Sequence, residues 1–154
     1  MPDGSLRNIL ILDTAESDWR EAMAFLAAQS YEFRFQGKWT GNRFPRSTAV
    51  LFPSARNEEL TLLSVNISGV IVNCHFFAVA RIQFDLDPRE VTDGRRLAGL
   101  FAFMQGLANA VRKEVRMAPD GVPEHPIFTC RPNDTRIDYQ PFFSGPKDTM
   151  SRHR

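Results

Sequence analysis

The residues of this chain that are best suited to chemistry lie along a single stretch, residues 70–87. Read with a period of two, the stretch puts a row of polar side chains on one face, which includes Asn73, His75, Arg81, Gln83 and Asp85. Successive side chains of a strand point to opposite faces, so these five share a surface. In a straight strand His75 and Arg81 stand about 20 Å apart, and they cannot serve one small substrate unless the strand bends sharply. We therefore interpret the row as a solvent-facing surface.

Two carboxylates of the same stretch have the spacing of an acid–base pair. Asp85 and Asp87 share a face and lie about 7 Å apart by strand geometry, and paired carboxylates can do general acid–base work. Asp87, however, directly precedes Pro88, and Asp followed by Pro is typical of a helix start at which the carboxylate caps the first turn. We expect capping and solvation rather than catalysis.

A metal site or a cysteine nucleophile is the next candidate, drawn from Cys74, His75, His125 and Cys130. Their spacings match no standard zinc pattern, and Cys74 and His75 are strand neighbours that point to opposite faces. Cys74 belongs to the apolar face, where a buried thiol is protonated and shielded. We expect both cysteines to be reduced and structural, and we expect no metal or cofactor.

No common catalytic motif is present in the sequence. The patterns G-x-G-x-x-G, G-x-x-x-x-G-K-[ST], G-x-S-x-G and H-E-x-x-H do not occur. Their absence removes the usual nucleotide-binding, hydrolase and zinc-protease interpretations. An enzyme stays open, but we favour a non-catalytic protein.

The segment Arg34–Arg46 carries four basic residues among aromatic ones and contains no acidic residue. Basic groups interleaved with stacking aromatics hold single-stranded nucleic acid in many proteins. The whole chain, however, has a net charge of only +1, so its overall charge does not attract it to nucleic acid or to an anionic membrane. We interpret the segment as a hairpin loop, and neither nucleic acid nor a membrane is an expected partner.

The length of 154 residues, with 43% hydrophobic and 24% charged residues, is typical of one globular domain. We expect a single α+β domain over residues 1–154, in which residues 119–154 form a Pro-rich C-terminal arm with six of the ten prolines. No apolar run reaches the roughly 18 residues of a membrane-spanning helix. The N-terminus lacks the basic and apolar regions of a signal peptide, and the two cysteines make no disulfide framework, so we expect a cytoplasmic protein.

The stretch 70–87 also carries the strongest structural signal of the chain. The face opposite the polar row is apolar at nine successive positions: Val70, Val72, Cys74, Phe76, Ala78, Ala80, Ile82, Phe84 and Leu86. This alternation predicts one half-buried strand. Its length of about 60 Å is unusual for a small domain, so we expect a bulge or bend near residues 77–80. The alternative, two strands joined by a turn, has no Gly, Pro, Asn or Asp to support it.

The remaining pattern predicts strands over residues 8–13, 31–36, 48–52 and 60–67, helices over 16–28 and 95–117, and short edge strands over 127–130 and 136–139. The fold class is α+β: a curved antiparallel sheet in the order β-α-β4-α, plus one or two short C-terminal strands. Each helix has one apolar stripe, so both helices should pack on one face of the sheet. Over residues 8–117 this order resembles the TATA-binding-protein-like and helix-grip folds, a resemblance that implies a fold and no function.

Three apolar residues interrupt the polar face of residues 70–87, which indicates that something covers it. The candidate partner-binding residues are Ile71, His75, Phe77, Val79 and Arg81. The cover is either the chain's own arm, Ile127–Phe143, or another molecule. Our first hypothesis is a non-catalytic intracellular binding module whose partner is another protein or a second copy of this chain.

The alternative function is that of a carrier for an apolar small molecule, held between the long helix and the curved sheet. A cavity among Phe76, Phe84, Phe101 and Met104 would favour this carrier, whereas a filled core there would favour the interaction module.

Overall fold

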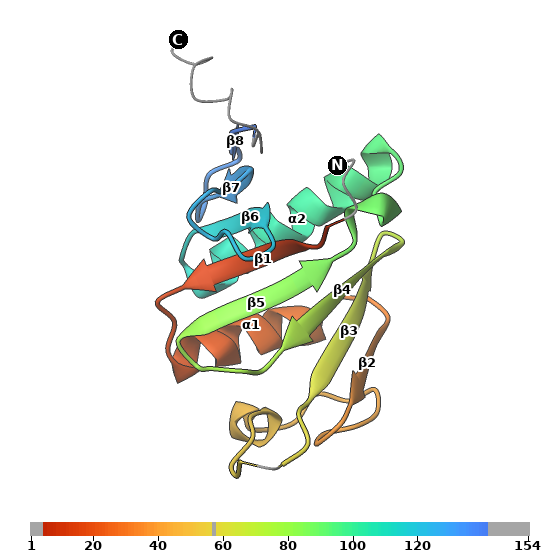
Figure 1. Cartoon of the computed structure of the whole chain (residues 1–154), viewed down its shortest axis with the longest axis vertical. Coiled ribbons are helices and arrows are strands. Elements are labelled where there is room, and N and C mark those ends of the chain that lie inside the picture. Colours follow the sequence, from red (N-terminus) through yellow and green to blue (C-terminus); the bar gives the residue numbers. More distant parts are fainter. Residues whose placement is uncertain (1–4, 57, 142–154) are drawn as a thin grey trace.

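The computed structural model describes residues 5–56 and 58–141, and in this part of the chain every strand belongs to one antiparallel sheet (Figure 1). The strand order across the sheet is β2-β3-β4-β5-β1-β6-β7-β8, and the sheet does not close into a barrel. The strands are β1 (Arg7–Leu12), β2 (Phe33–Gln36), β3 (Leu62–Ile67), β4 (Val70–His75), β5 (Arg81–Leu86), β6 (Val115–Pro119), β7 (Phe128–Cys130) and β8 (Ile137–Tyr139). The helices are α1 (Glu16–Ala28) and α2 (Gly94–Val111), with 3-10 turns η1 (Thr48–Leu51) and η2 (Pro88–Glu90).

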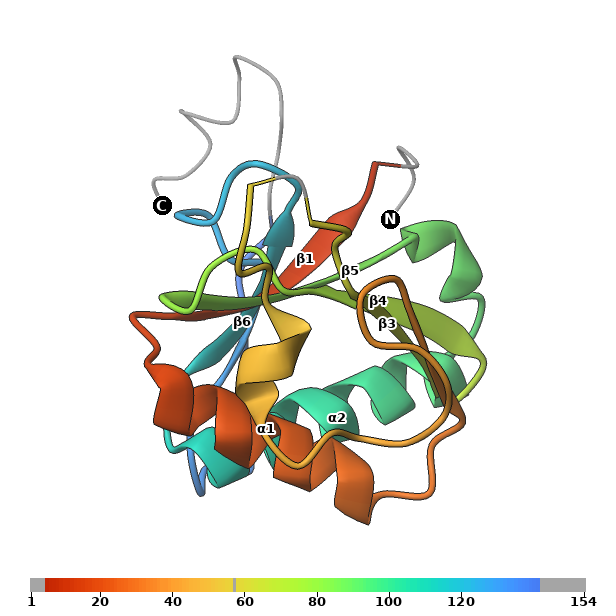
Figure 2. The same ribbon diagram turned by 90° about the horizontal axis from the view of Figure 1, so that it is seen from below.

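Both α-helices cover the same face of the sheet, which confirms the predicted two-layer α+β fold (Figure 2). Each helix buries one stripe at helical spacing, as an amphipathic helix on a sheet does. The buried residues of α1 are Trp19, Ala22, Met23 and Leu26, and those of α2 are Leu100, Phe103, Met104, Leu107, Ala108 and Val111. The helices also touch one another closely, because a Cβ atom at Gly106 would lie only 2.4 Å from the ring of Phe25. None of the described helices is both long and apolar enough to cross a bilayer.

The stretch 70–87 is a hairpin, so the prediction of one continuous strand is wrong and the two-strand alternative is correct. Strands β4 and β5 pair antiparallel, with Cys74 opposite Phe84 and Val72 opposite Leu86. The numbers of paired residues differ by an even amount, so apolar positions of β4 pair with apolar positions of β5 and both sets face the core. Seven of the nine predicted apolar positions are buried, and the two exposed ones, Ala78 and Ala80, lie in the turn.

Two further differences from the sequence prediction have local causes. Residues 48–51 form the 3-10 turn η1 instead of a strand, because the Ser47 hydroxyl caps the Ala49 N–H and Thr48 bonds to Glu16 of α1. Helix α2 ends at Val111, not at residue 117, because Arg112 adopts a left-handed conformation with φ of 64°. The chain then enters β6, whose Val115 has both the helical spacing from Val111 and the alternating spacing of a strand.

Strand β6 pairs with β1 and brings the Pro-rich arm into the sheet. Beyond it, β7 and β8 extend the sheet at the edge opposite β2 (Figure 1). Phe128 of β7 packs against Phe101 of α2, with ring centroids 4.8 Å apart, and against Tyr139 of β8. The described part of the arm therefore lies beside β6, and the strands β1 and β6 separate it from β5.

Candidate functional site

The turn between β4 and β5, residues 76–80, is held by the start of α1. The carbonyl oxygen of Val79 accepts two hydrogen bonds, from the Thr14 hydroxyl at 2.6 Å and from the Trp19 indole N–H at 2.9 Å. The main-chain N–H of Thr14 donates to the carbonyl of Ala80 at 3.0 Å. Trp19 is fully buried, and buried donors and acceptors that lose their partners are costly. The turn is therefore fixed in place by long-range contacts.

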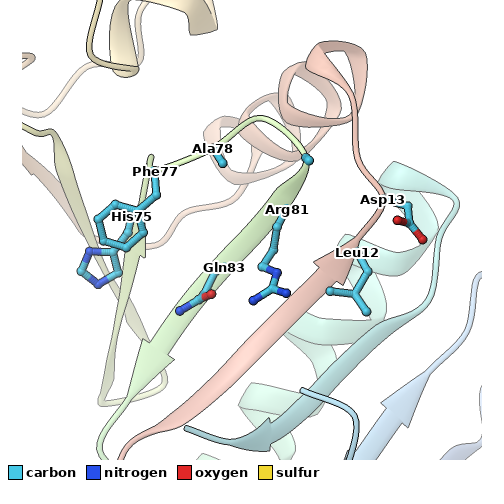
Figure 3. Close-up of a pocket in the computed structure, with 8 residues that line it drawn as sticks. Leu12, Asp13, His75, Phe77, Ala78, Arg81 and Gln83 are labelled. Atoms are coloured by element: carbon cyan, nitrogen blue, oxygen red, sulfur yellow. The ribbon is translucent and has the colours of Figure 1, made fainter. Parts of the chain in front are cut away.

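A hollow of about 530 Å³ lies on the sheet face opposite the helices, beside this turn. Its walls come from both arms of the hairpin and from the end of β1 (Figure 3). The residues that line it are Leu12, Asp13, His75, Phe77, Ala78, Ala80, Arg81 and Gln83. The hairpin thus folds His75 and Arg81 onto one hollow, which corrects the expectation that a strand keeps them too far apart.

His75 is held in one orientation from two sides. Its Nε2 lies 2.6 Å from a carboxylate oxygen of Asp85, and its ring stacks on Phe77 with centroids 5.0 Å apart and planes inclined by 8°. An imidazole oriented by a carboxylate can act as a general base. The side chains that line the hollow, however, include no hydroxyl, thiol or amine to serve as a nucleophile. The clearest effect of the pair is to hold the Phe77 ring in place.

Arg81 and Gln83 project side by side from β5 (Figure 3). They are two residues apart on one strand, so both side chains lie on the same face of the sheet. Neither side chain forms a hydrogen bond or an ion pair with any residue in the described part of the chain. The hollow therefore presents a guanidinium group and an amide group whose polar atoms are available to a ligand.

The five predicted partner-binding residues do not all come together. His75, Phe77 and Arg81 line the hollow, and Val79 is in the adjoining turn with 40% of its surface exposed. Ile71 is also 40% exposed, but it lies near the other end of β4, opposite Asn66 of β3.

Sequence reasoning missed the contribution of β1 to this hollow. Leu12 and Asp13 complete its wall, yet they lie more than 60 positions before His75. Leu12 ends an apolar run and Asp13 precedes a helix, so both have an ordinary local explanation. No signal in the sequence connects them to His75 or Arg81.

The described part of the C-terminal arm does not cover this surface. Phe77 is 59% exposed, and β7 and β8 lie at the far edge of the sheet (Figure 1). Two residues of the predicted cover, Phe142 and Phe143, fall outside the described residues. Within the described chain, the apolar side chains at the turn face solvent.

The two carboxylates of the predicted acid–base pair serve separate purposes. Asp85 bonds to His75, whereas Asp87 caps η2 by accepting the Arg89 N–H at 2.9 Å and forms an ion pair with the Arg89 guanidinium. The bonds to Arg89 lower the pKa of the Asp87 carboxyl. The predicted capping function of Asp87 is confirmed.

Both cysteines are buried free thiols. Burial, and to a smaller extent the nearby charge of Asp85, raises the pKa of Cys74 well above its ordinary value. Burial also raises the pKa of Cys130 to about 11. Within residues 5–56 and 58–141, no three His, Cys, Asp or Glu side chains are grouped so that they could hold a metal ion.

The four residues expected to outline a ligand cavity have different packing partners. Phe84 packs edge-on against Phe103, with centroids 5.3 Å apart, while Phe76 packs against Trp19 on α1. Phe101 lies at the rim of the core, where it meets β7. Phe76, Phe84 and Met104 belong to the buried core between the helices and the sheet.

The basic and aromatic loop borders a second hollow, of about 560 Å³. Its aromatic rings already have partners within the chain. The guanidinium of Arg43 lies 5.6 Å from the centre of the Trp39 ring, and Phe44 packs on Phe33 and Phe35 of β2. These contacts support the interpretation of the segment as a structured hairpin loop.

Comparisons with protein-family models, with curated proteins and with solved structures gave no match. Function must therefore be argued from the chemistry of the site, because a fold by itself implies none.

Proposed function

We propose that this chain is a non-catalytic interaction module that docks a partner protein at the β4–β5 turn. The docking residues are His75, Phe77, Val79 and Arg81, named the turn surface below. One observation carries the proposal: the Phe77 ring is 59% exposed, yet it is held in one orientation by stacking on His75. Exposed aromatic side chains beside arginine are the usual energetic centres of protein interfaces.

The rigidity of the turn supports this proposal. Binding loses free energy when mobile loops must become ordered. Here the turn backbone is already tied to α1 through Thr14 and Trp19, and His75 is already tied to Asp85. A partner therefore meets a surface that needs little ordering.

The packed core supports an interaction module over the alternative carrier of an apolar molecule. The side chains expected around such a ligand, Phe76, Phe84 and Met104, are buried against other parts of the chain. Both cysteines are free thiols, which suits a reducing compartment. On that ground we propose a cytoplasmic location for the module.

The proposal is tested by capture from a lysate of the protein's own cells. The wild-type chain is compared with Phe77→Asp and with a control, Tyr139→Asp, which alters an exposed aromatic residue at the opposite edge of the sheet. We expect a protein that wild type and Tyr139→Asp retain equally and that Phe77→Asp retains at least about tenfold less, a change of about 1.4 kcal/mol. Equal retention by all three chains would refute the proposal.

A second copy of the chain is the competing occupant. Light scattering on the purified protein decides this point, because a self-associating surface gives a dimer without any other protein. We expect a monomer. A dimer that Phe77→Asp disperses, and that Tyr139→Asp does not, would assign the turn surface to self-association instead.

A further inference from the structure

Arg81 is a permanently charged group that no anion neutralises within the described chain. Two carboxylates lie in its vicinity, but Asp85 bonds to His75 and Asp13, on the far wall of the hollow, forms no ion pair with it (Figure 3). The planar guanidinium has five N–H donors in a geometry that matches a carboxylate. The amide of Gln83 adds two donors beside it. Together these groups form a receptor for a planar anion.

A side-chain carboxylate fits this receptor better than a C-terminal one. Chain termini are usually captured by successive free main-chain N–H groups. Strand β5 pairs with β1 over Arg81–Leu86 and with β4 over Gln83–Leu86, so from Gln83 onward its main chain is engaged in two ladders. The donors of Arg81 and Gln83 are side-chain groups on this strand, and they are suited to another side chain.

A phosphate group fits it less well. Phosphorylated motifs are generally recognised by several arginines together, which balance a charge close to −2. The hollow has one arginine, and the carboxylates of Asp13 and Asp85 lie at or next to its walls. They would repel a second negative charge, whereas a single carboxylate can be matched by Arg81 alone.

The position of Phe77 defines what must stand next to the carboxylate. Its ring lies on the hairpin wall of the hollow, across from Leu12 at the end of β1 (Figure 3). An apolar side chain that follows the acidic residue can pack on this ring while the carboxylate meets Arg81. The surface thus combines one charge contact with one apolar contact.

We propose that the turn surface recognises an acidic side chain adjacent to an apolar one in the partner protein. Arg81 and Gln83 bind the carboxylate, and Phe77 packs against the apolar neighbour. This inference rests on the proposed function, because it specifies the chemistry of the docked segment.

The test uses three short peptides as probes of the full-length chain. The first has the sequence Ala-Glu-Phe-Ala with both ends blocked, the second replaces its Glu by Gln, and the third is the Gln peptide with a free C-terminal carboxylate. NMR spectra follow the Nε–H signal of Arg81 and the side-chain amide of Gln83. We expect the Glu peptide to shift both signals and to bind about tenfold more tightly than the other two. Equal affinities for the Glu and Gln peptides would overturn the inference.

Two arginine variants assign the preference to a residue. Arg81→Gln should abolish the difference between the Glu and Gln peptides. The control Arg34→Gln, an exposed arginine of β2 on the same sheet face, should leave it unchanged. A preference that survives Arg81→Gln would place the carboxylate elsewhere and overturn the assignment.

The same variants separate a failure of this inference from a failure of the proposed function. If Phe77→Asp abolishes partner capture while Arg81→Gln changes neither capture nor the peptide preference, the interaction module stands and the carboxylate receptor is wrong. If Phe77→Asp leaves capture unchanged, the proposed function falls, and this inference falls with it.

Discussion

The indole N–H of Trp19 donates a hydrogen bond to the carbonyl of Val79, 60 positions later in the chain, at 2.9 Å. This bond joins the first helix to the β4–β5 turn, which has no residue of its own that favours a turn. The Trp19 ring also packs against Phe76, at the beginning of that turn, with centroids 5.2 Å apart. The shape of the turn surface therefore depends on a residue that takes no part in it.

Removal of the indole N–H should weaken the fold and loosen the turn. Trp19→Phe leaves the Val79 carbonyl with only the Thr14 hydroxyl, so we expect a loss of about 1 to 2 kcal/mol in the free energy of unfolding. Urea denaturation measures it. Trp39→Phe is the control, because its N–H bond to the Arg43 carbonyl is exposed. A loss no larger for Trp19→Phe than for Trp39→Phe would contradict the anchoring function.

Core substitutions in α2 should follow the burial of the side chains. Leu107 is fully buried, so Leu107→Ala is expected to lower the free energy of unfolding by about 2 to 5 kcal/mol. Phe101→Ala should cost less, because Phe101 is only partly buried and contacts Phe128 at the rim. Thermal or urea unfolding gives the order, and a larger loss for Phe101→Ala would show that the arm carries more of the stability than its position indicates.

The thiol of Cys74 should react slowly with a thiol reagent while the protein is folded. Its raised pKa keeps the group protonated at pH 8, and its complete burial blocks access. The labelling rate should therefore match that of unfolding, with Cys130→Ser used so that one thiol is observed. Rapid labelling in the native state would contradict both the burial and the strand register.

The free energy of unfolding should depend on pH above 9 because the thiol of Cys130 is buried. Its pKa is about 11 in the folded chain against an ordinary value of 9.0, so the folded state keeps a proton that the unfolded state has lost. The protonated Cys130 thiol therefore contributes its full stability to the fold below pH 9, and this contribution is lost as the pH rises toward 11. Urea unfolding at pH 8 to 11 should fall less steeply for Cys130→Ala than for wild type, and identical slopes would argue against the shift.

The orientation of His75 should matter for binding more than for stability. Asp85→Ala and Asp87→Ala each remove one carboxylate and should each lower the free energy of unfolding slightly. Asp85→Ala acts through loss of the bond to His75, and Asp87→Ala acts through loss of the cap of η2. Only Asp85→Ala should reduce partner capture several-fold, since Phe77 then loses its oriented neighbour. Equal capture by the two variants would show that the stacking is incidental.

The sequence by itself determined which side chains share a face. Alternation at a period of two placed Cys74 and Phe84 in the core and His75, Phe77 and Arg81 on the opposite face, and the structure confirms this although the strand is broken. The two faces are preserved because residues paired across the turn differ in number by an even amount, so odd positions pair with odd positions and even with even. Helical spacing likewise predicted the bounds of α1 and its buried stripe, whereas in α2 it predicted Leu100, Met104, Leu107, Ala108 and Val111 but missed the buried Phe103.

Only the tertiary structure decided that the stretch 70–87 reverses direction near residues 77–80 instead of bending, and therefore which residues meet. The turn has no local signal because its stabilising partners, Thr14 and Trp19, come from the far end of the chain. Strand β6 was not predicted for a related reason. The position of Val115 fits the spacing of a helix and of a strand equally well, and only its pairing with Cys130 selects the strand. The periodicity of a sequence indicates whether a side chain is buried or exposed. The hollow at Arg81, by contrast, is formed by contacts between segments that are distant in the sequence.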